Sequence, residues 1–228
     1  MLTGLEHIRL SERPLVVCDV DDVVLQFATP FEAFLETRGH RLLPRSFKLT
    51  GNIVSGTDES VVEAPAVKAL IDDFFMEQER WQTPFADAVD SLHALGKEAD
   101  LVFLTAMPPR HAEVRRRLLD QLTLSFPMIA TEEAKGPVLA ALHGARPLPV
   151  AFVDDMVHNL HSVGDHVSDC LLVYLPPALE IFRFAPEPQE TVRRVETWPE
   201  AAAVIRTHFT ALGRQAGVIA TGSLASSR

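Results

Sequence analysis

Two aspartates separated by one residue, Asp19 and Asp21, directly follow the apolar run at residues 14–18. Such a run predicts a strand buried on both faces, as in a parallel sheet that helices cover. In an open parallel sheet the ligand crevice lies beyond the carboxyl ends of the strands, where both aspartates fall. Side chains two apart on extended backbone point the same way, so the two carboxylates can share a cation. This arrangement suits metal-assisted phosphoryl transfer.

Two further predicted strands also end in polar side chains. The apolar run 101–104 is followed by Thr105, whose hydroxyl can hold a phosphate oxygen. The apolar run 150–153 is followed by Asp154 and Asp155, which add two carboxylates. Because parallel strands end at the same edge of a sheet, we expect these groups near the first aspartate pair.

A lysine supplies positive charge between these two strands. Lys135 precedes Gly136 and Pro137 at a predicted helix start. An ammonium group and the free backbone N–H groups of a helix start both favour an anion. One sheet edge would then carry a nucleophile, further carboxylates, a hydroxyl and a cation.

Size and charge limit the classes of function. The chain has 228 residues and a formal net charge of −10. That length accommodates one full α/β core and a small additional module. The negative charge argues against binding to nucleic acid or to an anionic membrane, since both attract basic patches. Cys18 and Cys170 each lie in an apolar run and are expected to be buried thiols of a reducing compartment. No apolar stretch approaches transmembrane length, so a cytoplasmic location is expected.

Predicted strands and helices alternate along most of the chain, which indicates βαβ units and a doubly wound parallel sheet. The predicted strands are residues 14–18, 100–105, 127–131, 150–153 and 170–174. The predicted helices are residues 87–95, 110–122, 137–142, a segment from about 158, and 199–212. Residues 1–27 and 82–213 are therefore expected to form the α/β core, and residues 214–228 a loose tail of small and polar residues.

Residues 28–81 interrupt this alternation and are expected to form a small, mostly helical inserted module. Thr29 and Pro30 suit a helix start, and Gly39 suits a helix end. Residues 40–57 contain Pro, Gly and Ser at short intervals and are predicted to be irregular. Residues 66–79 carry apolar side chains at helical spacing, which predicts a second helix there.

The chemistry-bearing segments resemble the four motifs of the haloacid dehalogenase-like hydrolases. The sequence DVDDV at 19–23 resembles their DxDx(T/V) motif, and FVDD at 152–155 resembles their acidic motif. Leu104-Thr105 is similar to their strand-end threonine, and Lys135-Gly136 to their lysine. Order and spacing also agree, and the resemblance covers residues 13–27 and 84–176. It implies a Rossmann-like core.

The resemblance also implies a cap domain. This family inserts caps either between the first and second motifs or between the second and third. Here 84 positions separate Asp21 from Thr105, whereas 30 separate Thr105 from Lys135. Residues 28–81 would therefore be a cap of the first kind, which in this family is helical.

Each motif residue acquires an implied role. Asp19 would attack phosphorus and form an aspartyl-phosphate, and Asp21 would act first as general acid and then as general base. Thr105 and Lys135 would hold the phosphoryl oxygens. The implied Mg²⁺ ligands are Asp19, the backbone carbonyl of Asp21, Asp155 and, in a supporting position, Asp154.

The implied function is magnesium-dependent hydrolysis of a small phosphorylated metabolite by a monomer or small homo-oligomer. Asp21 argues against a dehalogenase, because those family members lack the second aspartate. A phosphosugar mutase shares all four motifs and stays open. A phosphonatase needs a cap lysine, for which Lys48 is the candidate. A catalytically idle binding protein is the alternative from another class, since fold does not determine function.

Other polar residues receive no catalytic role. Asp22 is expected to face solvent or to form a local cap, and Asn159 to brace the acidic motif or lie exposed. Arg110 lies close to the sheet edge that bears the site and could contact substrate, but the arginines at 115–117 favour a solvated basic helix face for it. The candidates for substrate selection in the inserted module are Arg41, Arg45, Lys48 and Asn52.

Overall fold

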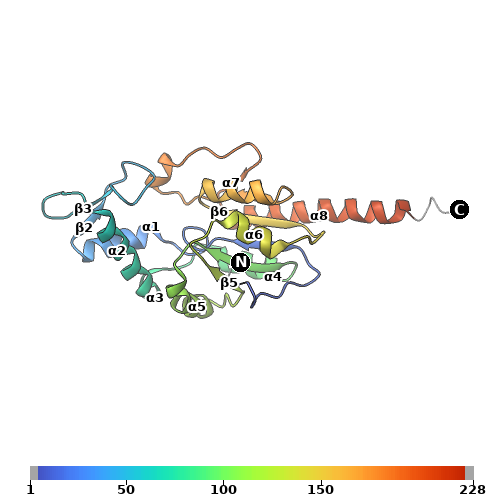
Figure 1. Cartoon of the computed structure of the whole chain (residues 1–228), viewed down its shortest axis with the longest axis horizontal. Coiled ribbons are helices and arrows are strands. Elements are labelled where there is room, and N and C mark those ends of the chain that lie inside the picture. The colour runs from blue at the N-terminus through green and yellow to red at the C-terminus, as the bar shows by residue number, and fades with distance from the viewer. Residues whose placement is uncertain (1–4, 224–228) are drawn as a thin grey trace.

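A parallel sheet forms the centre of the computed structural model, which describes residues 5–223, and the side chains of residues 5–212. In this part of the chain six strands are hydrogen-bonded in the order β5-β4-β1-β6-β7-β8 (Figure 1). The strands are β1 Leu15–Cys18, β4 Asp100–Thr105, β5 Met128–Ala130, β6 Val150–Asp154, β7 Leu171–Tyr174 and β8 Arg193–Arg194. All neighbouring strands are parallel. The predicted parallel α/β sheet is confirmed.

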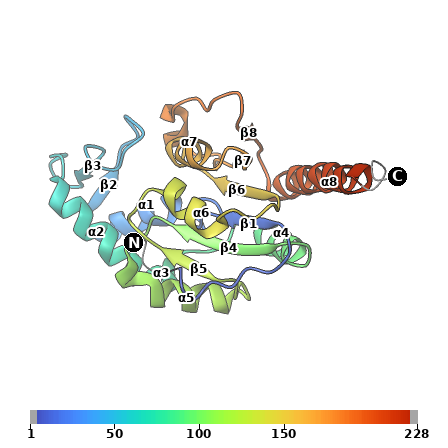
Figure 2. The ribbon, with the colours of Figure 1, turned by 45° about the vertical axis from the view of Figure 1, so that its right-hand side comes forward.

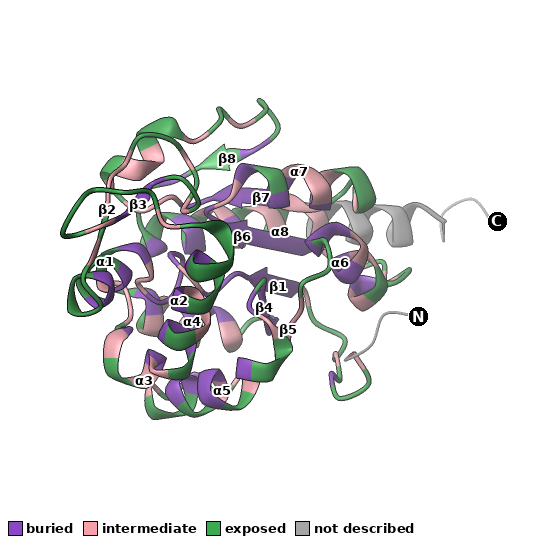
Figure 3. Ribbon diagram, turned by 60° about the vertical axis from the view of Figure 1, so that its left-hand side comes forward, coloured by how far each residue is buried: buried purple, intermediate pink, exposed green. Residues whose placement is uncertain are grey.

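Helices cover both faces of this sheet (Figures 2 and 3). They are α4 Ala88–Gly96, α5 Ala112–Gln121, α6 Lys135–His143, α7 Val157–His166 and α8 Trp198–Ser223. Val16 and Cys18 of β1 pack into the apolar cluster that contains side chains of α4, α5 and α8, whereas Leu15 and Val17 pack into the cluster with α6 and α7. All four are fully buried, which explains the unbroken apolar run. Within residues 5–223, no helix is both long and apolar enough to cross a membrane.

A separate group of short elements lies between β1 and α4, at the end of the molecule toward which β1 runs (Figures 1 and 2). We call residues 28–81 the cap segment. Its elements are α1 Ala28–Thr37, β2 His40–Leu42, β3 Ile53–Ser55, α2 Ala64–Met76 and α3 Gln78–Trp81. In its interior the rings of Phe31 and Phe34 stack with centroids 6.1 Å apart. Phe74 meets both rings edge to face, at 5.3 and 5.5 Å. The cap segment therefore has an apolar core of its own.

The stretch predicted to be irregular, residues 40–57, contains a two-stranded antiparallel sheet. His40 pairs with Ser55, and Leu42 with Ile53. Each strand has three residues, which is too short for an alternating pattern to stand out from the surrounding Pro and Gly. The prediction of an irregular segment was wrong for these residues.

The C-terminal helix is longer than predicted. α8 continues to Ser223, so residues 214–223 of the predicted loose tail are helical, and residues 224–228 lie outside the described part. Glycines at 213, 217 and 222 lower helix propensity by about 1 kcal/mol each relative to alanine. A helix already nucleated upstream tolerates single glycines, because adding a residue costs far less than starting a helix.

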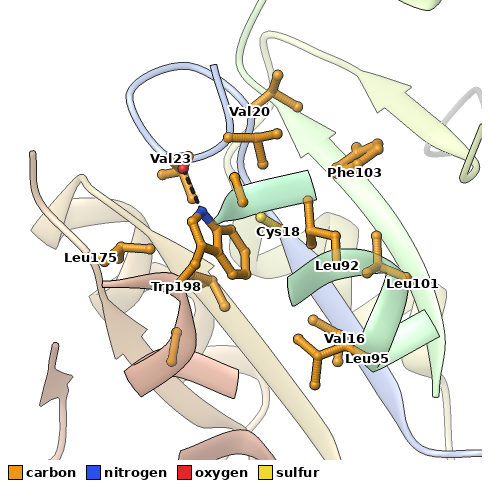
Figure 4. Packing of buried hydrophobic residues seen from close by; sticks show 14 of the residues in the cluster. Val16, Cys18, Val20, Val23, Leu92, Leu95, Leu101, Phe103, Leu175 and Trp198 are labelled. Carbon is orange, nitrogen blue, oxygen red and sulfur yellow. Dashed lines mark hydrogen bonds between the residues drawn. The ribbon is translucent and has the colours of Figure 1, made fainter. Parts of the chain in front are cut away.

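Trp198, the first residue of α8, fastens the loop that follows β1 (Figure 4). Its Nε1 donates a buried hydrogen bond of 2.9 Å to the carbonyl oxygen of Val23. Val20 and Val23 belong to the same buried apolar cluster as the indole ring. Trp198 thereby holds the loop that carries the first aspartate motif against the apolar core.

Candidate active site

Three carboxylates and one ammonium group meet beyond the ends of β1 and β6. Asp19, Asp154 and Asp155 are buried and each places an oxygen within 4.8 Å of the others. Lys135 Nζ lies 2.7 Å from Asp19 Oδ1 and 2.7 Å from Asp154 Oδ2. Four residues from three separate segments therefore form one compact cluster, as the strand-end argument predicted.

Lys135 is positioned by the start of α6 and by the residue that follows it. A side-chain carbon on Gly136 would lie 2.1 Å from the backbone oxygen of Ser162 in α7, so this close helix contact admits glycine alone. Burial by itself would lower the pKa of Lys135, but the charges of Asp154 and Asp19 outweigh it and raise that pKa. The lysine is therefore a fixed cation at the bottom of the site.

The two aspartates of the acidic motif have different surroundings. Asp154 accepts hydrogen bonds from Lys135, from the backbone N–H of Met156 at 2.7 Å and from Asn159 Nδ2 at 3.2 Å to each oxygen. Asp155 Oδ1, by contrast, is buried without a hydrogen-bond partner among the described residues. Asn159 thus braces Asp154, and Asp155 keeps a free oxygen for a ligand.

The cluster has more negative charge than Lys135 can compensate. Burial raises the pKa of Asp19 to about 7. The charge of Lys135 opposes this shift, and the charges of Asp154 and Asp21 add to it. Burial and the charges of Asp154, Asp19 and Asp22 raise the pKa of Asp155 well above its usual value. Asp19 Oδ1 lies 2.7 Å from Lys135 Nζ and has no other polar partner among the described residues.

This surplus of buried oxygen ligands fits a divalent cation. Three carboxylates with one lysine leave two uncompensated negative charges when all are ionised. Magnesium prefers such oxygen ligands and keeps several waters, so the free oxygens of Asp19 and Asp155 suit it. The side chain of Asp21 is not part of this cluster.

Asp22 is buried and does not face solvent, which excludes one of the two predicted alternatives. It has a φ of 56° and turns its carboxylate onto the start of α1, where it accepts hydrogen bonds from the N–H of Phe27 at 2.8 Å and of Ala28 at 3.2 Å. Burial raises its pKa to about 6, and those two hydrogen bonds oppose the shift. Asp22 therefore caps the start of α1 and links the loop after β1, which we call the site loop, to the cap segment.

Asp21 is held by an arginine that the sequence interpretation placed in solvent. Arg115 of α5 is fully buried, and its guanidinium binds both Asp21 oxygens, at 2.8 and 3.2 Å. Thr105, also buried, donates to Asp21 Oδ2 at 3.4 Å. The prediction of a solvated Arg115 was wrong. Arg117 on the same helix is exposed and pairs with Glu79, as a solvated face requires.

Two glutamines complete this network: Gln78 of the cap segment and Gln82, just after the cap segment ends. Gln82 Nε2 donates to Asp21 Oδ1 at 2.8 Å, while Gln82 Oε1 accepts from Arg115 at 3.0 Å. Gln78 of α3 is buried and accepts a hydrogen bond from Arg115 Nε. Both glutamines contact Arg115, so the conformation of Asp21 depends on where α3 lies.

One signal in the sequence could have identified Arg115. Positions 115, 118, 119 and 122 have the spacing i, i+3, i+4 and i+7, and the last three are leucines. Arg115 therefore occupies the apolar face of its helix, whereas Arg116 and Arg117 do not. A charged residue on such a face is buried with a partner or is functional.

The remaining polar candidates divide by their partners. Arg41 pairs with Glu59 at the surface, and Arg110 pairs with Asp72 of α2. Asn52 is buried and donates to the backbone oxygens of Ser46 and Lys48, both at 2.7 Å, so it shapes its own loop. The structure brings neither Arg41 nor Asn52 to the carboxylate cluster. Lys48 is exposed and lines a cavity over it.

That cavity has a volume of about 320 Å³ and lies between the cap segment and the strand ends. Asp19, Asp21 and Asp155 line its floor. Side chains of the cap segment and of the loop after β7 line the rest. The arrangement can hold an anionic group on the floor next to a carboxylate nucleophile.

Comparison with known proteins identifies the fold. No protein-family model matches the sequence, and no curated protein sequence matches it. Among solved structures, a haloacid dehalogenase-like family hydrolase from Xanthomonas campestris is similar with a TM-score of 0.55 at 17% identity, over 90% of this chain and 95% of the other. A predicted phosphoglycolate phosphatase from Haemophilus somnus 129PT gives a TM-score of 0.54 at 13% identity, over 85% and 98%.

A third similar structure, an HAD family hydrolase from Deinococcus radiodurans R1, contains bound phosphate and sodium. Its TM-score is 0.54 at 15% identity, over 86% of this chain and 96% of the other. At these identities the comparison establishes architecture. The chain has the fold of the haloacid dehalogenase-like hydrolases, which the motifs at its strand ends predicted.

Proposed function

We propose that this protein is a magnesium-dependent phosphatase that hydrolyses a small phosphate monoester through an aspartyl-phosphate at Asp19. One observation carries the proposal: Asp19 lies buried at a strand end, in ion-pair contact with Lys135 and beside the partner-free oxygen of Asp155. A structural carboxylate at this position would be fully hydrogen-bonded, as Asp154 is. The fold supports the same class of reaction.

In the first step the Asp19 carboxylate attacks phosphorus. The new bond joins Asp19 to phosphorus while the bond to the ester oxygen breaks, and that oxygen leaves with a proton from Asp21. Lys135 balances the charge that gathers around Asp19 and the phosphoryl oxygens. The Thr105 hydroxyl, which donates to Asp21 in this structure, can turn to a phosphoryl oxygen.

In the second step water displaces Asp19 from phosphorus. Asp21, now deprotonated, accepts a proton from the water, whose oxygen bonds to phosphorus as the aspartyl-phosphate bond breaks. Phosphate is released and Asp19 is regenerated. In the observed conformation both Asp21 oxygens accept hydrogen bonds, so Asp21 must give up at least one contact before each proton transfer.

The carboxylates of Asp19 and Asp155, with the backbone carbonyl of Asp21, would hold the magnesium ion. When bound, it would neutralise the repulsion between the anionic nucleophile and the anionic substrate. Asp154 would stay with Lys135 and Asn159 and keep the loop in place.

Hydrolysis of p-nitrophenyl phosphate tests this proposal. We expect turnover with Mg²⁺, loss of turnover after chelation, and loss in Asp19→Asn, whose amide is nearly isosteric but a far poorer nucleophile. Asp165→Asn is the matched control, because Asp165 is an exposed residue of α7. Turnover in Asp19→Asn above a few per cent of the unsubstituted protein would contradict the covalent mechanism.

A further inference from the structure

The cavity above the carboxylate cluster is polar on its floor and apolar on its walls. The groups that can bind a phosphoryl group lie on the floor. The walls carry eight large apolar side chains, four from residues 27–75 and four from the core: Phe27, Phe47, Leu49, Phe75, Met107, Met156, Ile181 and Phe182. The phosphoryl group of a substrate would therefore lie on the floor, and the group esterified to it would lie between the walls.

The other polar lining groups are either already hydrogen-bonded or exposed. Besides Asp19, Asp21 and Asp155, the polar side chains among the described lining residues are Asp22, Asn159, Lys48 and His158. Asp22 accepts hydrogen bonds at the start of α1 and Asn159 donates to Asp154, whereas Lys48 and His158 are exposed. A hydroxyl group buried against such walls loses its hydrogen bonds to water without replacement. A sugar or other polyol as leaving group would therefore bind poorly, whereas an apolar group of similar size would gain from leaving water.

The far side of the cavity is closed by a contact between two distant segments. Phe47 of the cap segment meets Phe182 of the loop after β7 edge to face, with ring centroids 5.1 Å apart. Phe182 belongs to a short 3₁₀ helix, Glu180–Phe184. Phe75 and Met107 also line the cavity and are themselves buried. Aromatic and thioether side chains from separate segments thus contribute to its walls.

We propose that the leaving group of the substrate is an apolar, ring-sized alcohol or phenol that fills this space. The proposal rests on the phosphatase function proposed above and names the substrate class for the same site. A cavity of about 320 Å³ has room for a phosphoryl group on the floor and one ring between the apolar walls. Lys48 at the rim tolerates an anionic substituent on the outer side of that ring.

The preference for an apolar leaving group is tested with two esters that have the same ring size and the same type of alcohol. Cyclohexylmethyl phosphate and glucose 6-phosphate are both monoesters of a primary alcohol on a six-membered ring, one apolar and one rich in hydroxyls. With Mg²⁺ present, we expect kcat/KM for the apolar ester to exceed that for the sugar ester by about tenfold or more. Equal values, or a preference for the sugar, would overturn the proposal.

Substitution of the aromatic wall should remove this preference. Phe182→Ala is expected to reduce the ratio of the two kcat/KM values by about tenfold, since an aromatic pair and its buried area are lost. Phe184→Ala is the matched control, because Phe184 lies in the same 3₁₀ helix, is exposed and does not line the cavity. A ratio that stays the same in Phe182→Ala would contradict the proposed wall.

Binding to the Asp19→Asn variant separates this proposal from the phosphatase function. Calorimetry with each ester reports on the cavity without turnover. Tighter binding of cyclohexylmethyl phosphate by Asp19→Asn supports the apolar site even if the unsubstituted protein hydrolyses neither ester, in which case the proposed function fails alone. Hydrolysis of p-nitrophenyl phosphate combined with equal binding of both esters would refute the apolar site and leave the phosphatase function standing.

Discussion

Arg115 is the strongest test of how this site is held together. Its side chain is fully buried, while that of Asp21 is 19% exposed, and the two form a bidentate ion pair. Arg115→Met keeps a long apolar chain on α5 but removes the counter-charge of Asp21 and the donor to two glutamine oxygens, while Gln82 and Thr105 still donate to Asp21. Removing one partner of a buried ion pair typically costs about 3–5 kcal/mol.

We therefore expect Arg115→Met to lower the free energy of unfolding by about 3–5 kcal/mol, measured by urea denaturation. This is a large part of the roughly 5–15 kcal/mol that stabilises a typical domain. Adding Asp21→Asn should recover part of the loss, because the uncompensated carboxylate is then gone. Arg117→Met on the exposed face of the same helix is the control and should change stability far less.

Activity gives the second readout for Arg115. Arg115→Lys keeps the charge but loses the planar, bidentate geometry, so we expect kcat to fall with little change in KM. If Arg115→Met were as stable as the Arg117→Met control, the buried network would not hold Asp21 and our interpretation of it would be wrong. An unchanged kcat in Arg115→Lys would show that this network does not position the acid.

Three further predictions concern the surroundings of the site. The pKa of Asp19 is about 7 and that of Asp22 about 6, and both exceed the usual 3.8. Between pH 3.8 and these raised values the folded protein therefore binds more protons than the unfolded chain. Without divalent metal, urea unfolding should therefore show stability falling from pH 4 to pH 7, and Mg²⁺ should restore it at pH 7; a rise in stability with pH would contradict this. Asp22→Asn keeps a cap residue that tolerates positive φ and should stabilise the metal-free protein at pH 7.5 by about 1–3 kcal/mol, whereas destabilisation would show that the charge is needed. Trp198→Phe removes the hydrogen bond to Val23 and should lower Tm and kcat together; a lower Tm with unchanged kcat would mean that Trp198 supports the core but not the site loop.

The clustering of Asp19, Lys135, Asp154 and Asp155 could be predicted from the sequence because it follows from strand ends. Each residue comes directly after a buried apolar run or at a helix start, and parallel strands bring those points to one edge. The sequence gives less basis for choosing between Asp154 and Asp155 as the direct metal ligand. That choice depends on a lysine 19 positions away and on the direction of two neighbouring side chains. That Asp155 is the direct metal ligand stays a prediction, which the partner-free oxygen of Asp155 motivates.

The Asp21 network shows what local patterns miss. Arg115 lies 94 positions after Asp21, and the contact forms because α5 and the return of the cap segment pack on the same side of the site loop. The run of three arginines suggested a solvated face, although helical spacing places the first of them among leucines. The apolar cavity was also missed, because its walls come from six separate stretches of the chain that meet through tertiary packing.

The same limit applies to the secondary structure. The predicted ranges of β4 and β6 agree closely with the structure, since buried central strands are unbroken apolar runs. The strands β2 and β3 are stabilised by pairing with each other and by the aromatic core of the cap segment, which no short window reveals. The extension of α8 beyond residue 212 runs against the small and polar composition that predicted a loose tail.

The central claim, covalent catalysis by Asp19, is tested most directly by trapping the phosphorylated protein. The protein is mixed with p-nitrophenyl phosphate and Mg²⁺, quenched in acid within the first turnover and analysed by peptide mass spectrometry. We expect one phosphoryl group on the peptide that contains Asp19, and none in Asp19→Asn treated in the same way. Turnover without a phosphorylated peptide at any quench time, or a phosphoryl group on another residue, would contradict the mechanism.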